Sequence, residues 1–132
     1  MGQARSVGVR PSIVVIDNDR AQRTLVRLHL VNAGYEALEA EDAIEGGYLI
    51  ARTSPALVIC DVNTPYMSGY ELLAALKADP LTQNIPVVFL AVDDVAERAQ
   101  KLGAVAYLRK PVPPHRLLDI VGLFAGDAAE AR

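Results

Sequence analysis

The stretch ALVICDVNTPYMSGYELLAALKA, residues 56–78, decides the fold that we expect for this chain. Its first five residues are an uninterrupted apolar run, which predicts a strand over 56–60. Further along, Leu72, Leu73 and Leu76 fall at helical spacing, which predicts a helix over 68–78 that Asp79 and Pro80 close. A strand followed directly by a helix is the repeating unit of a parallel sheet.

The same alternation continues on both sides of this stretch. Residues 12–16 (SIVVI) are apolar and β-branched after the initial serine, which is typical of a strand buried on both faces. The 19–33 helix carries Leu25 and Leu28 at helical spacing, and the 114–124 helix carries Leu117, Leu118, Val121 and Phe124. The further elements that we expect are strands over 35–40, 87–91 and 104–108 and helices over 42–52 and 94–102. This rhythm predicts an α/β fold with five parallel strands and helices on both faces.

Length and composition bound the classes of protein to consider. A chain of 132 residues suits one domain. We expect a leader over 1–11, a domain over 12–125 and a tail or linker start over 126–132. The single cysteine excludes an internal disulfide framework and favours a cytoplasmic location. No apolar run approaches the ~20 residues of a membrane span, and no secretory signal follows Met1. The net charge of −3 argues against direct binding of nucleic acid.

Polar residues follow the strands where a site is expected. Ligands of open parallel sheets bind beyond the carboxyl ends of the strands. Asp17, Asp61 and Lys110 follow three different strands and would therefore meet at one edge. Two close carboxylates repel unless a cation lies between them, and oxygen ligands suit Mg²⁺. A neighbouring lysine suits a phosphoryl group. The residues predict a site for Mg²⁺ and phosphate.

Four segments carry a resemblance to a known family. The segments are IVVIDND (13–19), VICDVNTPYMSGYELL (58–73), IPVVFLA (85–91) and GAVAYLRKP (103–111). In order and spacing they resemble the receiver domain of bacterial response regulators, and the match covers residues 12 to about 125. The resemblance implies a flavodoxin-like, doubly wound (βα)5 fold, with one parallel sheet between two helical layers.

The resemblance also implies roles for individual residues. Asp61 would accept a phosphoryl group from a sensor histidine kinase or phosphotransfer protein. Asp17, Asn18, Asp61 and the backbone carbonyl of Asn63 would hold Mg²⁺. Lys110 would pair with the phosphoryl oxygens, positioned by a cis bond to its following proline. At most, such a domain catalyses the phosphorylation and dephosphorylation of its own aspartate.

Three positions depart from the family pattern or bear on its switch. Asn18 replaces an acid, which should weaken metal binding, and is equally typical of a turn or cap. Ala91 replaces a Thr or Ser whose hydroxyl binds the phosphoryl group. A hydrogen bond to a charged group contributes roughly 1.5–3 kcal/mol, as large as a typical allosteric coupling of about 1–3 kcal/mol. We therefore expect a weak or absent switch, which leaves Tyr107, the aromatic switch position, without its driver.

The spacing from Ala91 to Lys110 is a few residues shorter than is usual in the family. The deficit falls in the 94–102 helix, which in the family belongs to the output face together with the 104–108 strand and the 114–124 helix. A homodimer through this face is the assembly that the resemblance implies. The shortened helix indicates that the output mode of this chain differs from the ordinary one.

Two other functions compete with a phosphoaccepting receiver. A pseudo-receiver would keep the fold as an interaction module without phosphate control, as Asn18 and Ala91 suggest. A haloacid-dehalogenase-like phosphatase would use the run Asp17-Asn18-Asp19 as a D-x-D pair, but Ala21 stands where that family needs Thr or Val. The run over residues 61–73 also has no place in such an enzyme.

Overall fold

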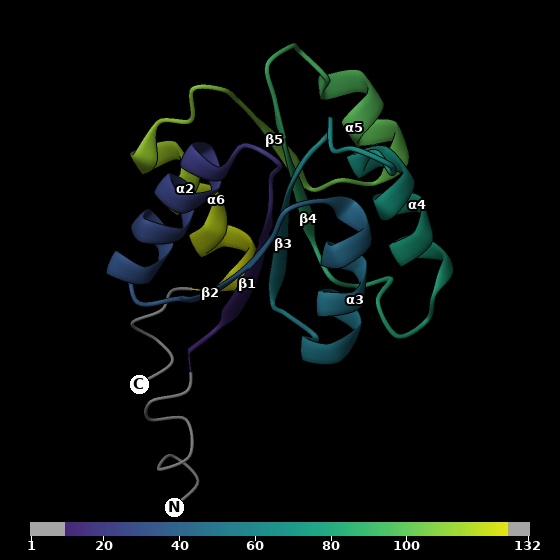
Figure 1. Cartoon of the computed structure of the whole chain (residues 1–132), viewed down its shortest axis with the longest axis horizontal. Helices are drawn as coiled ribbons and strands as arrows, with labels where there is room; N and C mark the ends of the chain where they lie inside the picture. The colour runs from purple at the N-terminus through teal and green to yellow at the C-terminus, as the bar shows by residue number, and fades with distance from the viewer. Residues whose placement is uncertain (1–9, 127–132) are drawn as a thin grey trace, which may run out of the picture.

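The computed structural model describes residues 10–126, which form a parallel sheet of five strands in the order β2-β1-β3-β4-β5. Helices alternate with the strands along the chain (Figure 1). The strands are β1 (Ser12–Ile16), β2 (Glu36–Ala40), β3 (Leu57–Asp61), β4 (Val87–Ala91) and β5 (Ala106–Arg109). The helices are α2 (Arg20–Asn32), α3 (Ala43–Thr53), α4 (Gly69–Ala78), α5 (Ala96–Leu102) and α6 (Pro114–Ala125). The expected doubly wound α/β fold is confirmed.

The helices cover the sheet in two layers. Helices α2 and α6 lie on one face, and α3, α4 and α5 lie on the other (Figure 1). Alternate residues of each inner strand enter opposite cores: Val14 packs with the α3–α5 layer, whereas Val15 packs with the α2–α6 layer. Every residue of β3 and β4 is buried. Burial on both faces explains why these strands read as continuous apolar runs rather than alternating ones.

The strand order reverses at β1. The chain runs from β1 to β2 on one side and then crosses to β3 on the other, and open α/β sheets bind their ligands at such a reversal, beyond the carboxyl ends of the strands. The register pairs Ile16 with Cys60, Asp61 with Leu90 and Ala91 with Arg109. The residues that end these strands therefore lie along the same edge of the sheet.

Several expected boundaries were wrong by one or two residues. Asp19, Asp42 and Ser68 precede their helices as N-caps whose side chains accept backbone N–H bonds, because such residues favour the cap over the helix interior. Helix α5 begins at Ala96 rather than at 94 and has seven residues, fewer than any other helix within residues 10–126. Strand β5 runs over Ala106–Arg109 rather than 104–108.

Two helices carry apolar residues on exposed as well as on buried faces. In α2, Val26 and Leu30 are buried, while Leu25 and Leu28 are exposed. In α6, Phe124 is exposed although Leu117 and Val121 are buried. A helix with apolar residues around much of its circumference allows more than one inward face, and packing against the sheet decides between them.

The expected leader and tail lie outside the described residues except at residues 10, 11 and 126. No helix of the described part of the chain is long and apolar enough to cross a membrane.

Candidate functional site

The structure brings two carboxylates and one ammonium group together at the carboxyl edge of the sheet. Asp17 follows β1, Asp61 ends β3 and Lys110 follows β5. The two carboxylates are buried, with exposed fractions of 1% for Asp17 and 8% for Asp61. Lys110 Nζ lies 3.0 Å from Asp17 Oδ2 and donates a hydrogen bond to Asp61 Oδ2. The three side chains expected at one edge thus form a single charged cluster.

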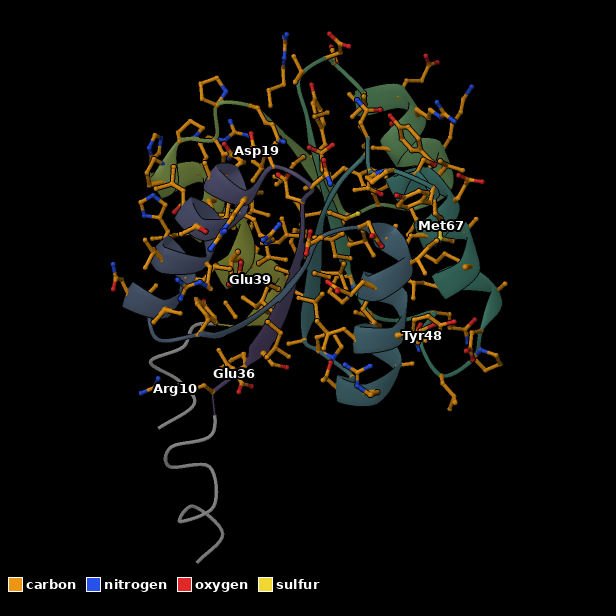
Figure 2. All side chains as sticks on the ribbon, in the orientation of Figure 1. Arg10, Asp19, Glu36, Glu39, Tyr48 and Met67 are labelled. Atoms are coloured by element: carbon orange, nitrogen blue, oxygen red, sulfur yellow. The ribbon has the colours of Figure 1, made fainter. Side chains whose placement is uncertain are left out.

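The loops hold each carboxylate from its other side. The backbone N–H of Asp19 donates to Asp17 Oδ1 at 2.9 Å, and that of Asn63 donates to Asp61 Oδ1 at 2.7 Å. Asp19 also caps α2 by accepting the N–H groups of Ala21 and Gln22, and Figure 2 shows it at the start of that helix. One oxygen of each carboxylate is therefore fixed by its own loop, and the other faces Lys110.

Burial and the contacts between charged groups act in opposite directions on the pKa values of this cluster. Desolvation raises the pKa of Asp17, although the hydrogen bond from the Asp19 N–H and the positive charge of Lys110 oppose that shift. Desolvation also works to lower the pKa of Lys110, but its bonds to Asp61 and Asp17 outweigh burial and raise it. Lys110 is therefore held as a cation between the carboxylates.

The donor set fits a magnesium ion. Asp17 Oδ2 is buried and has no hydrogen bond of good geometry, even though the Lys110 ammonium lies 3.0 Å away. No three His, Cys, Asp or Glu side chains within residues 10–126 form a metal-binding group. Mg²⁺ needs no such group, because it binds through one or two carboxylates and keeps several waters. Asp17, Asp61 and the carbonyl of Asn63 suffice as a candidate set.

Asn18 lies at the margin of this cluster. Asn18 is exposed and lines a polar pocket of about 490 Å³ between α2 and β2, together with Arg20, Arg23 and Glu39. Its role as a metal ligand stays a prediction.

Ala91 and Tyr107 are the two residues at the expected switch positions, and their side chains have different surroundings. Ala91 is buried, its side chain is a methyl group, and its carbonyl accepts the N–H of Lys110 at 2.8 Å. The hydroxyl of Tyr107 donates to Asp94 Oδ1 at 2.8 Å, and the same oxygen accepts the N–H of Ala96 at 3.0 Å. These bonds lower the pKa of Asp94, and the bond to Asp94 raises that of Tyr107. The Asp94–Tyr107 contact was not predicted, because no local pattern joins residues 13 positions apart.

The loop between β3 and α4 places Asp61 by close backbone packing. A Cβ on Gly69 would lie 2.7 Å from the carbonyl oxygen of Asp61 and 3.0 Å from the Cα of Val62. The Gly69 N–H donates to the Val62 carbonyl at 3.0 Å, and Ser68 forms a capping box with Glu71. Only glycine fits this approach, which explains its place in the motif.

The same loop is tied to the neighbouring helix. Thr64 Oγ1 accepts the N–H of Ala43, the first residue of α3, at 3.3 Å and donates to the carbonyl of Met67. Between them Tyr66 adopts φ of 70°, a conformation that L-residues other than Gly, Asn and Asp seldom adopt.

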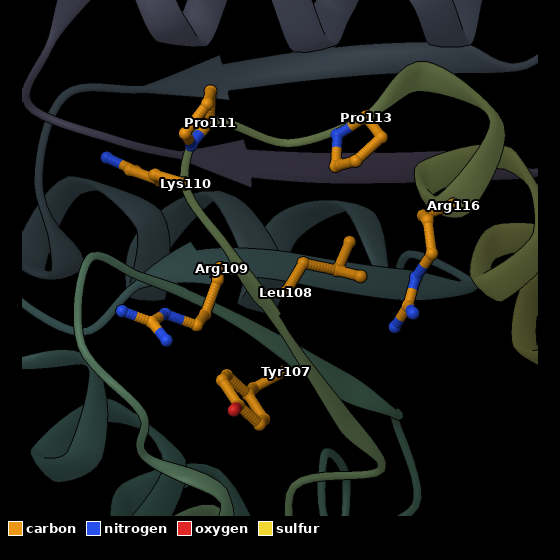
Figure 3. A pocket seen from close by; sticks show the side chains of 7 residues that line it. All are labelled: Tyr107, Leu108, Arg109, Lys110, Pro111, Pro113 and Arg116. Carbon is orange, nitrogen blue, oxygen red and sulfur yellow. The ribbon is translucent and has the colours of Figure 1, made fainter.

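A pocket of about 390 Å³ lies beside Lys110 but does not contain the carboxylate cluster. Its walls include Tyr107, Arg109, Pro111 and Arg116, and Figure 3 shows the Lys110 side chain extending away from Arg116. The Lys110–Pro111 peptide bond is cis, as expected. Asp17 and Asp61 do not line this pocket, so the candidate chemistry lies in the shallow cluster at the sheet edge.

Cys60, immediately before Asp61, is fully buried, and its thiol lies 3.2 Å from the Asp61 carbonyl oxygen. Desolvation first, and then the charges of Asp61 and Asp17, raise the pKa of the thiol. The thiol is therefore a core group.

The comparisons with known proteins agree with this geometry. A family model described as "Response regulator receiver domain" matches residues 13–122. The phosphate regulon regulator PhoB of Pseudomonas aeruginosa is 34% identical over 113 residues, which are 83% of this chain and 49% of PhoB. The polar-differentiation regulator DivK of Brucella anthropi is 28% identical over 120 residues, which are 89% of this chain and 98% of DivK. The chain thus spans about half the length of PhoB and nearly all of DivK.

Solved structures show the same relationship. The chemotaxis response regulator CheY4 of Vibrio cholerae aligns with a TM-score of 0.82 at 27% identity, covering 88% of this chain and 99% of CheY4. The receiver domain of the Francisella response regulator 1452 aligns with a TM-score of 0.81 at 26% identity, covering 88% and 97%.

Receiver domains in general bind Mg²⁺ at the phosphorylation site and interact with histidine kinases or phosphotransfer proteins, and they are not enzymes in the ordinary sense. The haloacid-dehalogenase-like alternative has no support in these matches. This chain belongs to the response regulator receiver domain family of two-component signalling.

Proposed function

We propose that Asp61 is the phosphoacceptor of this receiver domain and that the phosphorylated domain signals through protein contacts. The observation that carries the proposal is the cluster of Asp61 with Asp17 and Lys110 at the reversal of strand order. The loop after β3 binds Asp61 Oδ1 through the Asn63 N–H, and Lys110 contacts the other oxygen, Oδ2. Oδ2 is therefore the oxygen that would attack phosphorus. No finding favours the alternative of a module that works without phosphate.

The chemistry is an in-line displacement at phosphorus. The Asp61 carboxylate forms the new O–P bond while the P–N bond to a donor phosphohistidine breaks, and the electron pair leaves with the imidazole nitrogen. Lys110 exchanges its bond to the carboxylate for one to a phosphoryl oxygen and so stabilises the developing charge. A Mg²⁺ ion held by Asp17, Asp61 and the Asn63 carbonyl would supply further positive charge at those oxygens. Attack of water on the acyl phosphate returns free Asp61 and inorganic phosphate.

Partners and location follow from this role as predictions. The donor is a sensor histidine kinase or a phosphotransfer protein. A homodimer through the face of α5, β5 and α6 stays a prediction, as does a cytoplasmic location. Direct contact with nucleic acid is not part of the proposed function.

Intact mass spectrometry tests the proposal. We expect acetyl phosphate and MgCl₂ together to add one phosphoryl group to the wild-type protein, and we expect no adduct without MgCl₂. Asp61→Asn should remove the adduct, whereas Asp119→Asn, the same change at an exposed aspartate of α6, should keep it. Absence of an adduct on the wild type, under conditions that label an ordinary receiver, would leave the phosphate-independent module as the function.

A further inference from the structure

The guanidinium of Arg23 connects three elements beside the acidic cluster. Arg23 lies in the first turns of α2, and its side chain is only 11% exposed. Its Nη1 donates to the main-chain carbonyl of Asp17 at 2.8 Å, and its Nε donates to Glu39 Oε1 at 2.9 Å. One side chain thus joins the end of β1, helix α2 and the edge strand β2.

Glu39 is itself held from two sides. Its second oxygen, Oε2, lies 2.9 Å from Nε of Arg27, one helical turn beyond Arg23. The β2 residue Glu39 is in register with Val15, two residues before Asp17. The Arg27 side chain is 33% exposed. Within residues 10–126, no hydrogen bond or ion pair joins it to Asp17. Arg23 and Arg27 therefore share one carboxylate, but only Arg23 also bonds to Asp17, in the loop after β1.

We propose that Arg23 is a positioning residue for the metal and phosphoryl site, acting through the backbone of Asp17. The proposal rests on the proposed function of Asp61. The Asp17 N–H donates to the Ala40 carbonyl at 3.2 Å, and its own carbonyl accepts from Arg23. Both peptide groups that flank the Asp17 Cα are thus fixed. With Oδ1 held by the Asp19 N–H, the buried Oδ2 faces the Lys110 ammonium at 3.0 Å, on the side where a Mg²⁺ ion would bind.

The contacts require a guanidinium rather than any cation. Arginine presents several N–H donors in a rigid plane, so it can donate to Glu39 and to the Asp17 carbonyl at the same time in fixed directions. A lysine ammonium on a flexible stem is a single point of charge and would not hold both acceptors in this geometry. Arg23 and Arg27 share the Glu39 carboxylate, which therefore offsets only part of their positive charge.

The test compares Arg23→Lys with Arg27→Lys. Both variants keep the charge, lie on the same helix and disturb the same Glu39 carboxylate, but only the first removes the bond to Asp17. Backbone amide spectra recorded during titration with MgCl₂ give the dissociation constant. We expect Arg23→Lys to weaken Mg²⁺ binding by about 10-fold, the size typical of residues that orient metal ligands, and Arg27→Lys to leave it unchanged.

A second readout needs no metal. The Asp19 N–H is bonded to Asp17 Oδ1, so we expect its hydrogen exchange in metal-free buffer to accelerate in Arg23→Lys and not in Arg27→Lys. Urea unfolding of both variants shows whether a general loss of stability accounts for the effect.

The outcomes separate the two proposals. Equal weakening of Mg²⁺ binding in both variants, or wild-type binding and exchange in Arg23→Lys, would overturn the positioning role while phosphorylation of Asp61 stands. A wild type that accepts no phosphoryl group contradicts the proposed function instead, and the exchange of the Asp19 amide then decides by itself whether Arg23 holds the loop.

Discussion

Lys110 stands as the counter-charge to two buried carboxylates. Its side chain is largely buried, and it contacts both Asp17 and Asp61. Removing one partner of a buried ion cluster leaves the other charges without compensation. The stability of the metal-free protein therefore depends on this one side chain at the residue scale.

We predict that Lys110→Met lowers the free energy of unfolding by roughly 3–5 kcal/mol at neutral pH without Mg²⁺. Added MgCl₂ should restore more stability to the variant than it adds to the wild type, because the ion replaces the lost cation. Urea unfolding followed by circular dichroism measures both effects. The control is Lys101→Met on α5, an exposed residue whose ion pair with Glu97 contributes about 0.5 kcal/mol or less. Equal losses in the two variants would contradict the prediction.

The hydrogen bond between Tyr107 and Asp94 predicts a pH dependence at both ends of the scale. The pKa of Tyr107 is raised above its ordinary value of 10.0, so its contribution to stability is present below that value and is lost as pH rises through the folded-state pKa. The pKa of Asp94 is lowered below 3.8, so its contribution is present above that value and is lost as pH falls through the folded-state pKa. Across the neutral range the Tyr107 hydroxyl is therefore neutral and the Asp94 carboxylate is charged, so both contributions are present there.

Absorbance titration of tyrosinate isolates this contact. The Tyr107 signal is obtained by subtracting the titration of Tyr107→Phe from that of the wild type, and we expect its midpoint above 10.0. Asp94→Asn removes the charge that opposes ionisation, so the midpoint should move down. An unchanged midpoint would show that Asp94 does not hold the hydroxyl in solution.

At the scale of elements, the junction of β3 and α4 is set by one glycine. We predict that Gly69→Ala destabilises the protein by about 1–3 kcal/mol, because the new methyl group meets the backbone of Asp61 and Val62 rather than a movable side chain. Phosphoryl acceptance should fall with it, since relief of the clash displaces Asp61. Urea unfolding and intact mass after acetyl phosphate treatment measure the two effects.

Gly122 is the matched control for this change. A Cβ there would meet nothing within 4 Å, and the residue lies inside α6. Alanine at this position should stabilise the protein by roughly 0.5–1 kcal/mol. A Gly69→Ala variant as stable as Gly122→Ala would disprove the close approach.

The elements could be predicted from sequence where a local signal exists. Buried strands such as 87–91 show as apolar runs, and helix α4 has the same closing residue, Ala78, as expected. The convergence of Asp17, Asp61 and Lys110 followed from the parallel arrangement of the strands, because parallel strands end at one edge. The predicted helix ranges included the capping residues, since periodicity does not separate the residue before a helix from its first turn.

The contacts that the sequence could not predict are made by side chains of distant residues. Arg23 sits in an amphipathic helix like any surface arginine, and nothing local indicates that it reaches the Asp17 carbonyl and Glu39. Asp94 has the pattern of a loop acid, and its bond to Tyr107 depends on how β5 lies beside the shortened α5 segment. Such contacts follow from tertiary packing.

At the scale of the whole molecule, the question is whether occupancy of Asp61 changes the face of α5, β5 and α6. Ala91 ends β4, which lies between β3, the strand that carries Asp61, and β5. Its methyl group cannot donate a hydrogen bond to a phosphoryl oxygen. The missing bond of roughly 1.5–3 kcal/mol matches a whole allosteric coupling of about 1–3 kcal/mol. A receiver with this residue should take phosphate and change little elsewhere.

We predict that Ala91→Thr restores the response. Beryllofluoride, a phosphoryl analogue, should cause small amide shift changes over Ala106–Arg109 in the wild type and larger ones in Ala91→Thr. Ala91→Val is the control, because valine has the size and branching of threonine without the hydroxyl. Large changes in the wild type, or equal changes in the threonine and valine variants, would show that position 91 does not limit the response.

The buried thiol of Cys60 provides a way to measure how fast the centre of the sheet opens. It belongs to the only cysteine of the chain, and burial with a raised pKa keeps it from forming a reactive thiolate while the sheet is closed. An alkylating reagent can therefore modify it only when β3 separates from its neighbours. The rate of alkylation then measures the rate at which β3, the strand that carries Asp61, opens. Intact mass spectrometry distinguishes the alkylated molecules from the phosphorylated ones in the same sample.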